Sequence, residues 1–255
     1  MAIVDTLMVL KDIAQAENLS PPYMVGGFVR DILLVQNDKS LSKHKIKDID
    51  ITTGDEDIHE LSIKFAQRLG GDLLELDGHN EVKYRGLKFD FSKNVNYPNI
   101  DEWLNHIGIE YPTGLQRETF SRDFTINSLL MTPDFKRILD FTGRGRTDIE
   151  SRILTCPLSC LLSVRFDPRR ILRAYLFRAR YKFSFSDELR EAIRESLSYL
   201  ERVNRRYSSE MVNKILREDE RLLEELIADG ILQRLPMTKY VRSLLIKHRK
   251  LLEVL

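Results

Sequence analysis

The sequence predicts an α+β fold in the N-terminal part of the chain, followed by an all-helical part. Up to residue 153, segments with apolar residues at every second position alternate with segments at helical spacing. From about residue 159 the apolar spacing is helical throughout, and Gly and Pro are scarce. These patterns predict an α+β part over residues 1–153 and an all-helical part over residues 154–255.

The elements of the first part are expected in the following order. An amphipathic helix spans residues 2–18, and a short strand at Tyr23–Val25 leads through a glycine turn into a helix from about Phe28. The pattern then predicts a strand at 45–53, a helix at 55–71, a hairpin turning near Arg85-Gly86, an irregular segment at 94–114, a helix beginning at FTINSLLM, and a strand, glycine-rich loop and short helix within 137–154.

The net charge of +1 hides an uneven distribution along the 255 residues. Residues 1–151 hold 18 Lys and Arg against 25 Asp and Glu, whereas residues 152–255 hold 22 against 14. The basic half is therefore a candidate for binding phosphate or nucleic acid, although solvated helices also accumulate Lys and Arg.

Several protein classes are disfavoured by composition. No run of eighteen apolar residues is present, so we expect no membrane span, and the acidic N-terminus does not have the pattern of a signal peptide. Cys156 and Cys160 are too few for a disulfide scaffold or a cysteine zinc site. We therefore expect a soluble, cytoplasmic protein with reduced thiols.

The segment KDIDITTG carries two acids within a predicted strand. Side chains alternate between the faces of a strand, so Asp48 and Asp50 share one face while Ile49 and Ile51 point to the other. Two carboxylates held close together repel, and Lys45 and Lys47 are not placed to neutralise both. Mg²⁺ would relieve the repulsion, since it is usually held by one or two carboxylates plus substrate phosphates. The alternative is a solvated strand face.

Two neighbouring motifs favour the metal interpretation. In GGFVRD, Gly26 and Gly27 lie at a strand-to-helix turn where backbone N–H groups can approach a phosphate, and Arg30 follows in the first helical turn. In LKFDFSK, Asp90 alternates with two phenylalanines and could converge on the first two acids. Three acids, a glycine turn and a helix N-terminus together describe a two-metal phosphoryl-transfer site.

Five ordered blocks resemble a known family. GGFVRD, KDIDITTG, SRDFTINSLL, ILDFTGRGRTDIESRIL and FDPRRILRAYLFRARYKF resemble the class II tRNA nucleotidyltransferases and bacterial-type poly(A) polymerases, in order and approximate spacing. The resemblance covers residues from about 23 to about 183. It implies a polymerase-β-type nucleotidyltransferase head followed by a helical neck and body.

The resemblance also implies roles for individual residues. Gly26, Gly27 and Arg30 would hold the triphosphate, and Arg122 and Asp123 would recognise the ribose. The catalytic acids would be Asp48, Asp50 and Asp90, the first two binding Mg²⁺. Asp167 and Arg170 would read the base, with Arg173 also binding nucleotide, and Asp140, Gly143 and Asp148 would lie in a flexible loop that links head and neck.

The base-reading assignment agrees with hydrogen-bond chemistry. Cytosine and adenine each present an amino donor beside a ring-nitrogen acceptor, which a carboxylate and a guanidinium can match. Uracil and guanine carry N–H at that ring position and would oppose Arg170. We expect Asp167 and Arg170 to share a helix face, three residues apart. The alternative is a salt bridge between the two within the helix.

The sequence also departs from the family pattern. Ser121 stands where the family has Arg, Phe166 where it has Glu, and a later Arg and Glu motif survives loosely as Arg206 and Glu210. We expect a short form, because the family's C-terminal tail, which grips the tRNA elbow, has no counterpart in the sequence.

The predicted activity is template-independent, Mg²⁺-dependent addition of CMP and AMP, from CTP and ATP, to tRNA 3′ ends. Poly(A) addition, CC-addition, A-addition, an inactive RNA-binding module and a small-molecule nucleotidyltransferase are the alternatives. The basic residues expected to contact RNA phosphates are Arg165, Arg169, Arg170, Arg173, Arg178, Arg180 and Lys182, while Tyr175 and Phe177 are expected to pack in the core. The oligomeric state is open, with a homodimer as one option.

Overall fold

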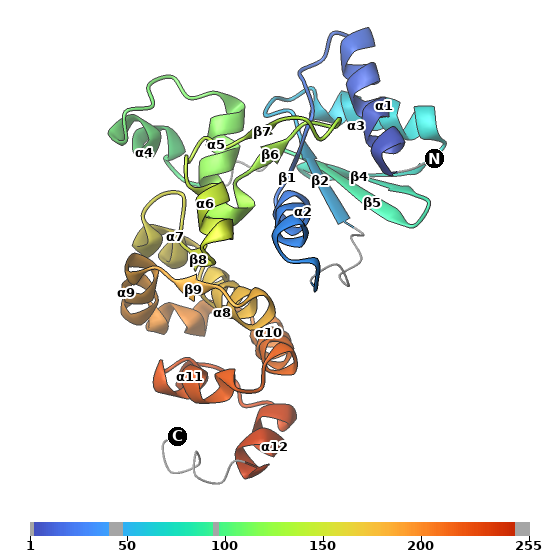
Figure 1. Ribbon diagram of the computed structural model, residues 1–255. Helices are drawn as coiled ribbons and strands as arrows, with labels where there is room; N and C mark the ends of the chain where they lie inside the picture. Colours follow the sequence, from blue (N-terminus) through green and yellow to red (C-terminus); the bar gives the residue numbers. More distant parts are fainter. Residues whose placement is uncertain (1–2, 41–47, 94–96, 248–255) are drawn as a thin grey trace. The chain divides into compact units, whose positions relative to one another are not determined.

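The computed structural model describes residues 3–40, 48–93 and 97–247. The chain divides into two compact units, Met1–Ser151 and Arg152–Leu255, which we call the head and the helical unit (Figure 1). The α+β head and the helical remainder confirm the predicted fold class. No helix in the described part of the chain is long and apolar enough to cross a membrane.

The head is built on a seven-stranded mixed sheet. Its strand order is β3-β4-β5-β2-β1-β6-β7, in which β2 and β5 are parallel and all other neighbours are antiparallel. The strands are β1 (Tyr23–Val25), β2 (Asp48–Thr52), β3 (Asp72–Leu76), β4 (His79–Tyr84), β5 (Leu87–Ser92), β6 (Leu130–Met131) and β7 (Ile138–Leu139). The helices are α1 (Ile3–Ala16), α2 (Gly27–Asn37), α3 (Ile58–Leu69), α4 (Ile100–His106), α5 (Gly114–Ser121), the 3₁₀ helix η2 (Thr125–Asn127) and α6 (Gly145–Glu150).

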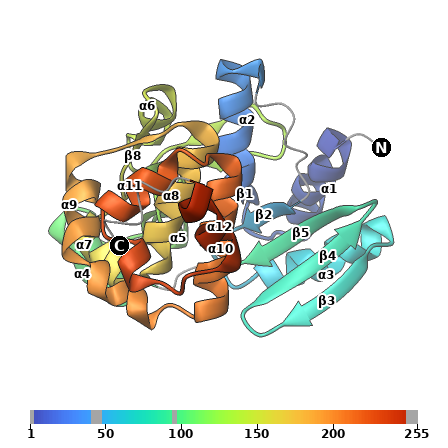
Figure 2. The ribbon, with the colours of Figure 1, turned by 90° about the horizontal axis from the view of Figure 1, so that it is seen from below.

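One face of the central strands is apolar and buried. Ile49 and Ile51 of β2 lie in register with Phe89 and Phe91 of β5, and all four are at most 1% exposed. Phe65 of α3 packs against both phenylalanine rings, at centroid distances of 5.1 and 5.4 Å. Figure 2 shows α3 beside the strands β3, β4 and β5. Because side chains alternate along a strand, the acids of β2 and β5 share the opposite face.

Parts of the head differ from the sequence prediction. FTINSLLM does not begin an α-helix: it forms the 3₁₀ turn η2 and then enters β6, which pairs with β1. Its buried residues serve a sheet, so tertiary packing overrides the helical pattern. The segment 94–114, which was expected to be irregular, contains α4, and α5 begins at its last residue and continues through a stretch for which no element was predicted. Strand β3 was also missed. The hairpin prediction is confirmed, since Arg85 and Gly86 both have positive φ between β4 and β5.

The helical unit contains one small sheet that the sequence did not predict. Strands β8 (Ile153–Leu154) and β9 (Ser184–Phe185) form a short parallel pair. Its helices are α7 (Cys160–Phe166), α8 (Arg169–Tyr181), α9 (Asp187–Glu195), η3 (Leu197–Arg202), α10 (Arg205–Glu218), α11 (Leu222–Ala228), η4 (Leu232–Arg234) and α12 (Lys239–Lys247). Tyr175 and Phe177 are buried, as expected.

Candidate active site

The centre of the candidate site is a pair of carboxylates on neighbouring strands. Asp50 of β2 lies directly in register with Asp90 of β5, on the face opposite the phenylalanine core. Partial burial and the negative charge of Asp50 both raise the pKa of Asp90. Like charges in adjacent register positions destabilise a sheet. This local repulsion is the electrostatic condition that a bound cation would relieve.

Asp48 lies on the same strand face, two residues before Asp50 and in register with Lys88, and its side chain is 68% exposed. The neutralising groups for the two acids of β2 come from outside their own segment. The Nζ atom of Lys88 lies 3.5 Å from Oδ1 of Asp48, and Nη1 of Arg122 lies 3.9 Å from Oδ2 of Asp50. Lys45 and Lys47 lie outside the described residues.

The acids fit a hard divalent cation that is completed by a substrate. Within residues 3–40, 48–93 and 97–247, no three His, Cys, Asp or Glu side chains form a ready-made metal cage. Mg²⁺ needs only one or two protein carboxylates when phosphates supply further oxygens. Asp50 and Asp90 provide such a pair, and Asp48 lies beside them.

The glycine turn before α2 lies against this site. Gly26 has φ +73°, and a Cβ atom placed on it would lie 2.8 Å from Oδ2 of Asp50 and 3.2 Å from Nη1 of Arg122. Any side chain would therefore be strained and would collide with the polar groups of the site. Gly27 begins α2, where its own hypothetical Cβ would lie 3.3 Å from Nη2 of Arg30.

Arg30 is part of a buried hydrogen-bond network. Its Nη1 donates to Oδ1 of Asn127 at 2.7 Å, and its Nε donates to Oδ1 of Asp31 at 2.8 Å. The Nδ2 atom of Asn127 donates in turn to Oδ1 of Asp123 at 2.8 Å. These hydrogen bonds tie the first turn of α2 to the RDFTIN motif, so they hold together two segments that are far apart in sequence.

Arg122 is held by a residue that the sequence analysis missed. Its Nη2 donates to Oε1 of Glu118, one turn earlier in α5, and Oε2 of Glu118 accepts from the Thr52 hydroxyl at 2.5 Å. Both Glu118 and Thr52 are fully buried. The only available signal was Glu118's position four residues before Arg122, and no helix was predicted between residues 114 and 119.

The residues expected to read the base lie in the helical unit and are arranged differently from the prediction. Asp167 is not within a helix: it caps the end of α7 with extended backbone and precedes α8. Its carboxylate accepts from Nε and Nη2 of Arg169 at 2.7 and 2.9 Å. Arg170 is buried and donates from Nη1 to the Ser163 hydroxyl at 2.5 Å. Arg173 lies over the Phe177 ring at 5.9 Å.

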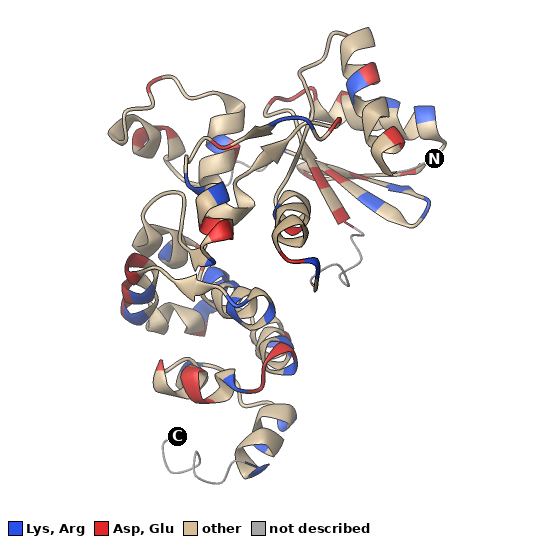
Figure 3. Ribbon diagram, viewed as in Figure 1, with Lys and Arg blue, Asp and Glu red and all other residues tan. Residues whose placement is uncertain are grey.

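Most of the basic cluster forms ion pairs within the helical unit, which the sequence analysis did not foresee. Figure 3 shows basic residues on α8 and α10 beside acidic ones. The cation–carboxylate pairs are Arg165–Glu195, Arg169–Asp167, Arg178–Glu225, Arg180–Glu218 and Lys182–Asp219. Arg205, Lys214 and Arg217 of α10 are exposed and extend the basic surface.

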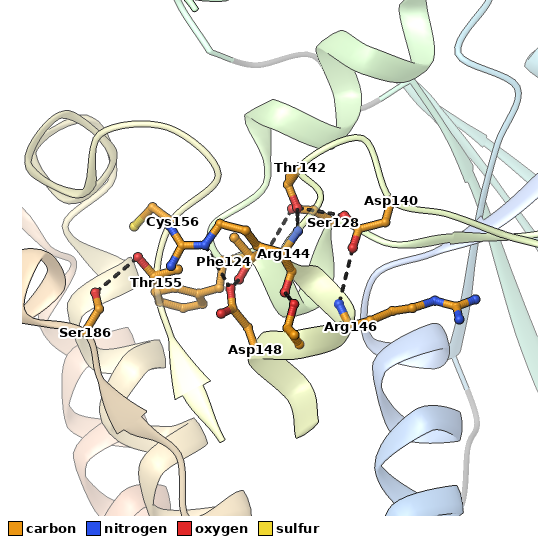
Figure 4. A network of polar contacts seen from close by, with 12 residues as sticks. Phe124, Ser128, Asp140, Thr142, Arg144, Arg146, Asp148, Thr155, Cys156 and Ser186 are labelled. Atoms are coloured by element: carbon orange, nitrogen blue, oxygen red, sulfur yellow. Dashed lines mark hydrogen bonds and ion pairs between the residues drawn. The ribbon is translucent and has the colours of Figure 1, made fainter. Parts of the chain in front are cut away.

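The ILDFTGRGRTDIE segment forms a hydrogen-bonded turn at the end of the head (Figure 4). Asp140 accepts from the Thr142 hydroxyl at 2.8 Å and from the Arg146 backbone N–H at 3.3 Å. Asp148 is buried and accepts from the Thr125 hydroxyl at 2.6 Å. A Cβ atom on Gly145 would lie 2.8 Å from the Thr125 carbonyl oxygen, so only glycine permits α6 to approach η2 this closely.

The motifs of the head match a family model described as the poly A polymerase head domain, over residues 22–155. The match covers more than half of the chain. The chain belongs to this family. Within the poly A polymerase head domain, the matched residues include the glycine turn, all three acids and the Arg122 network.

The proteins that are similar to the chain include the following three. A tRNA nucleotidyltransferase of Schizosaccharomyces pombe is 26% identical over 208 residues, covering 76% of this chain and 43% of that protein. A CCA-adding enzyme solved with CTP has a TM-score of 0.72 at 26% identity, covering 91% of this chain and 51% of that one. A Thermotoga maritima CCA-adding enzyme complexed with tRNA-CCA has a TM-score of 0.71 at 26% identity, covering 90% and 51%. The chain spans about half the length of the curated relatives it matches.

The structure also describes the burial and contacts of the positions that depart from the family pattern. Ser121 is buried, and its hydroxyl donates to the Arg117 carbonyl at 2.7 Å. Phe166 is 44% exposed at the end of α7. Arg206 and Glu210 form an exposed pair at 2.9 Å on α10, one turn apart.

Proposed function

We propose that this chain is a Mg²⁺-dependent, template-independent nucleotidyltransferase that adds CMP and AMP from CTP and ATP to tRNA 3′ ends. The observation that carries the proposal is the register of Asp50 and Asp90 beside the Gly26 turn, within a chain similar along 91% of its length to a CCA-adding enzyme solved with CTP. Carboxylates, a glycine turn and a helix N-terminus are the parts that phosphoryl transfer needs.

In this proposal the head binds the nucleoside triphosphate. Gly26 and Gly27 let the backbone approach the phosphates at the start of α2, while Arg30 shapes this turn through Asn127. Arg122 and Asp123 face the ribose. Asp48, Asp50 and Asp90 would hold Mg²⁺, which supplies Lewis-acid stabilisation of the attacking and leaving oxygens.

The reaction joins the RNA 3′ oxygen to the α-phosphorus of the nucleotide. The 3′ hydroxyl loses its proton, the bond from the α-phosphorus to the bridging oxygen breaks, and pyrophosphate leaves. Asp50 and Asp90 orient the reacting groups, because both carboxylates lie on one sheet face beside the glycine turn. Little covalent chemistry is required of the protein beyond positioning and electrostatic stabilisation.

The helical unit would select the base and bind the RNA. Asp167 is engaged by Arg169, yet each carboxylate oxygen has two lone pairs and can also accept from an amino group. Arg170 would donate to the ring nitrogen of cytosine or adenine. Because Arg165, Arg178, Arg180 and other members of the cluster are paired with carboxylates, exposed cations of α10 become the stronger candidates for phosphate contacts.

One incubation tests the proposal. Labelled tRNA that ends at the discriminator base is incubated with each NTP alone and with CTP and ATP together, in the presence of Mg²⁺. We expect two additions with CTP alone and three with both nucleotides. Asp50→Ala and Asp48→Ala should each abolish incorporation, whereas the exposed Glu60→Gln on α3 should not.

The other outcomes would replace this proposal by a specific alternative. A ladder of adenylates from ATP alone would indicate a poly(A) polymerase, which the description of the family model makes the second candidate. Only CC or only A addition would indicate a partial activity. No incorporation of any nucleotide by a folded chain would favour an RNA-binding module.

A further inference from the structure

The buried carboxylate of Glu118 lies beside the candidate site, next to the face of β2 that carries its acids. Thr52 and Asp50 are two residues apart on β2 and therefore share a strand face. The Thr52 hydroxyl donates to Glu118 at 2.5 Å and accepts from the backbone N–H of Gly54 at 3.0 Å. Glu118 is thereby fixed to the strand that carries the acids, although it belongs to α5.

Arg122 connects this buried carboxylate to the reacting face. Its Nη2 donates to Glu118, while its Nη1 is 3.9 Å from Oδ2 of Asp50 and 3.2 Å from the position of a Cβ atom on Gly26. Although burial opposes the charged form, Glu118 and Asp50 together raise the pKa of Arg122, so the guanidinium is charged. The side chain is only 11% exposed.

A purely structural ion pair would not require this arrangement. Buried ion pairs are often no more stabilising than apolar residues of the same size, because both charges lose their hydration. Here the guanidinium is shared between a fully buried acid and a half-exposed acid of the candidate site. The geometry restricts Arg122 to one orientation, with one edge toward Glu118 and another toward Asp50 and the glycine turn.

We propose that Glu118 is a positioning residue, which holds the Arg122 guanidinium in front of Asp50 and so sets how the site recognises the ribose of a nucleoside triphosphate. Thr52 fixes the Glu118 carboxylate from the other side. The inference rests on the proposed function, because it assumes that Arg122 faces the ribose of a bound nucleotide. It assigns no direct substrate contact to Glu118 or Thr52.

Two variants separate positioning from mere packing. Glu118→Gln keeps the size of the side chain but removes the negative charge that faces Arg122. Its amide N–H₂ either opposes the guanidinium donor to donor, or faces Thr52, whose hydroxyl must then accept instead of donate. Thr52→Val keeps the shape and removes the hydroxyl that orients Glu118. The matched control is Glu60→Gln, which removes the charge of an exposed glutamate that is likewise paired with a cation one turn away.

The measurements are dissociation constants for CTP and dCTP with Ca²⁺ in place of Mg²⁺, KM and kcat for both nucleotides with Mg²⁺, and the melting temperature. We expect Glu118→Gln to weaken CTP binding and to reduce the preference for CTP over dCTP by roughly tenfold, about the value of one charge-assisted hydrogen bond. KM should change more than kcat. Thr52→Val should show a smaller loss of the same kind, and Glu60→Gln none.

The inference is wrong if a folded Glu118→Gln or Thr52→Val protein keeps the CTP preference of the original chain while only its melting temperature falls. If Glu118→Gln does not fold, Thr52→Val and Arg122→Lys decide the question, since an unchanged preference in both would equally overturn it. Failure of the proposed function has a different signature: the unaltered chain would neither bind nor incorporate CTP, and the positioning role would fall with it.

Discussion

Replacing Asp90 by asparagine should make the head more stable while removing transfer activity. Asp50 and Asp90 are neighbours in register, and both partial burial and the Asp50 charge raise the pKa of Asp90. Ionisation of Asp90 therefore costs stability in the folded state. Asparagine has nearly the same shape but no charge, so Asp90→Asn removes this cost.

The size of the gain follows from the strand spacing. Adjacent strands lie about 4.8 Å apart, and two unit charges about 5 Å apart repel by roughly 0.8 kcal/mol in water and roughly 3 kcal/mol at an effective dielectric constant of 20. The Asp50 side chain is 40% exposed and has Arg122 at 3.9 Å, so solvent and this cation screen much of the repulsion. We expect a gain of about 1 kcal/mol, or about 2–4 °C in melting temperature.

The pH dependence has a defined sign. Because the folded-state pKa of Asp90 is raised, the folded chain binds the proton more tightly than the unfolded chain. The loss of folding stability caused by ionised Asp90 is absent below the ordinary aspartate pKa of about 3.9 and is complete above the raised pKa. The advantage of Asp90→Asn should therefore grow from pH 4 toward neutral pH.

The assay is thermal unfolding in EDTA at pH 4.0 and pH 7.5. Asp72→Asn is the control, because Asp72 is an exposed strand acid in register with Lys83 and its removal relieves no repulsion between acids. A melting temperature of Asp90→Asn equal to or below that of the unaltered chain at pH 7.5 would refute the reasoning. With Mg²⁺ and CTP added, the unaltered chain should have the higher melting temperature, because only its intact site gains stability from binding them.

Three further outcomes are expected from the same structure. Gly26→Ala should abolish nucleotide binding, measured by titration, because its Cβ would collide with Asp50 in a backbone conformation that alanine rarely adopts. Arg170→Ala should lose discrimination against UTP and GTP together with rate, measured as kcat/KM for the four nucleotides; unchanged selectivity with lower stability would make Arg170 structural. RNA binding should weaken steeply between 50 and 200 mM salt. The measurement is a plot of log Kd against log salt concentration, and a flat plot would argue against phosphate contacts.

The sequence was sufficient for the parts of the site whose geometry is local. The period of two along a strand correctly separates Asp50 from the buried Ile49 and Ile51. The turn of the hairpin could be predicted because Arg85 and Gly86 are a compact turn signal between two alternating segments. Each of these inferences needs only residues that are close together in the chain.

Contacts that depend on long-range register could not be predicted in this way. Lys88 reaches Asp48 only because β2 and β5 are parallel neighbours, and this pairing joins segments that are separated by a helix and a hairpin. Asp167 meets Arg169 rather than sharing a helix face with Arg170, because α7 ends just before it. In both cases an unpredicted boundary or pairing decides the partner of a charged group.

The face of β2 changes in environment along its length, which explains why two acids can occupy one strand. Asp48 is 68% exposed, Asp50 is 40% exposed, and Thr52 is fully buried. Each has a different partner: Lys88, Arg122 and Glu118. A charge can be held at Asp50 because Arg122 reaches it from the buried end, and Arg122 can be buried because Glu118 compensates its charge. The acid pair is therefore supported from inside the head, and a cation with its nucleotide can complete it from the solvent side.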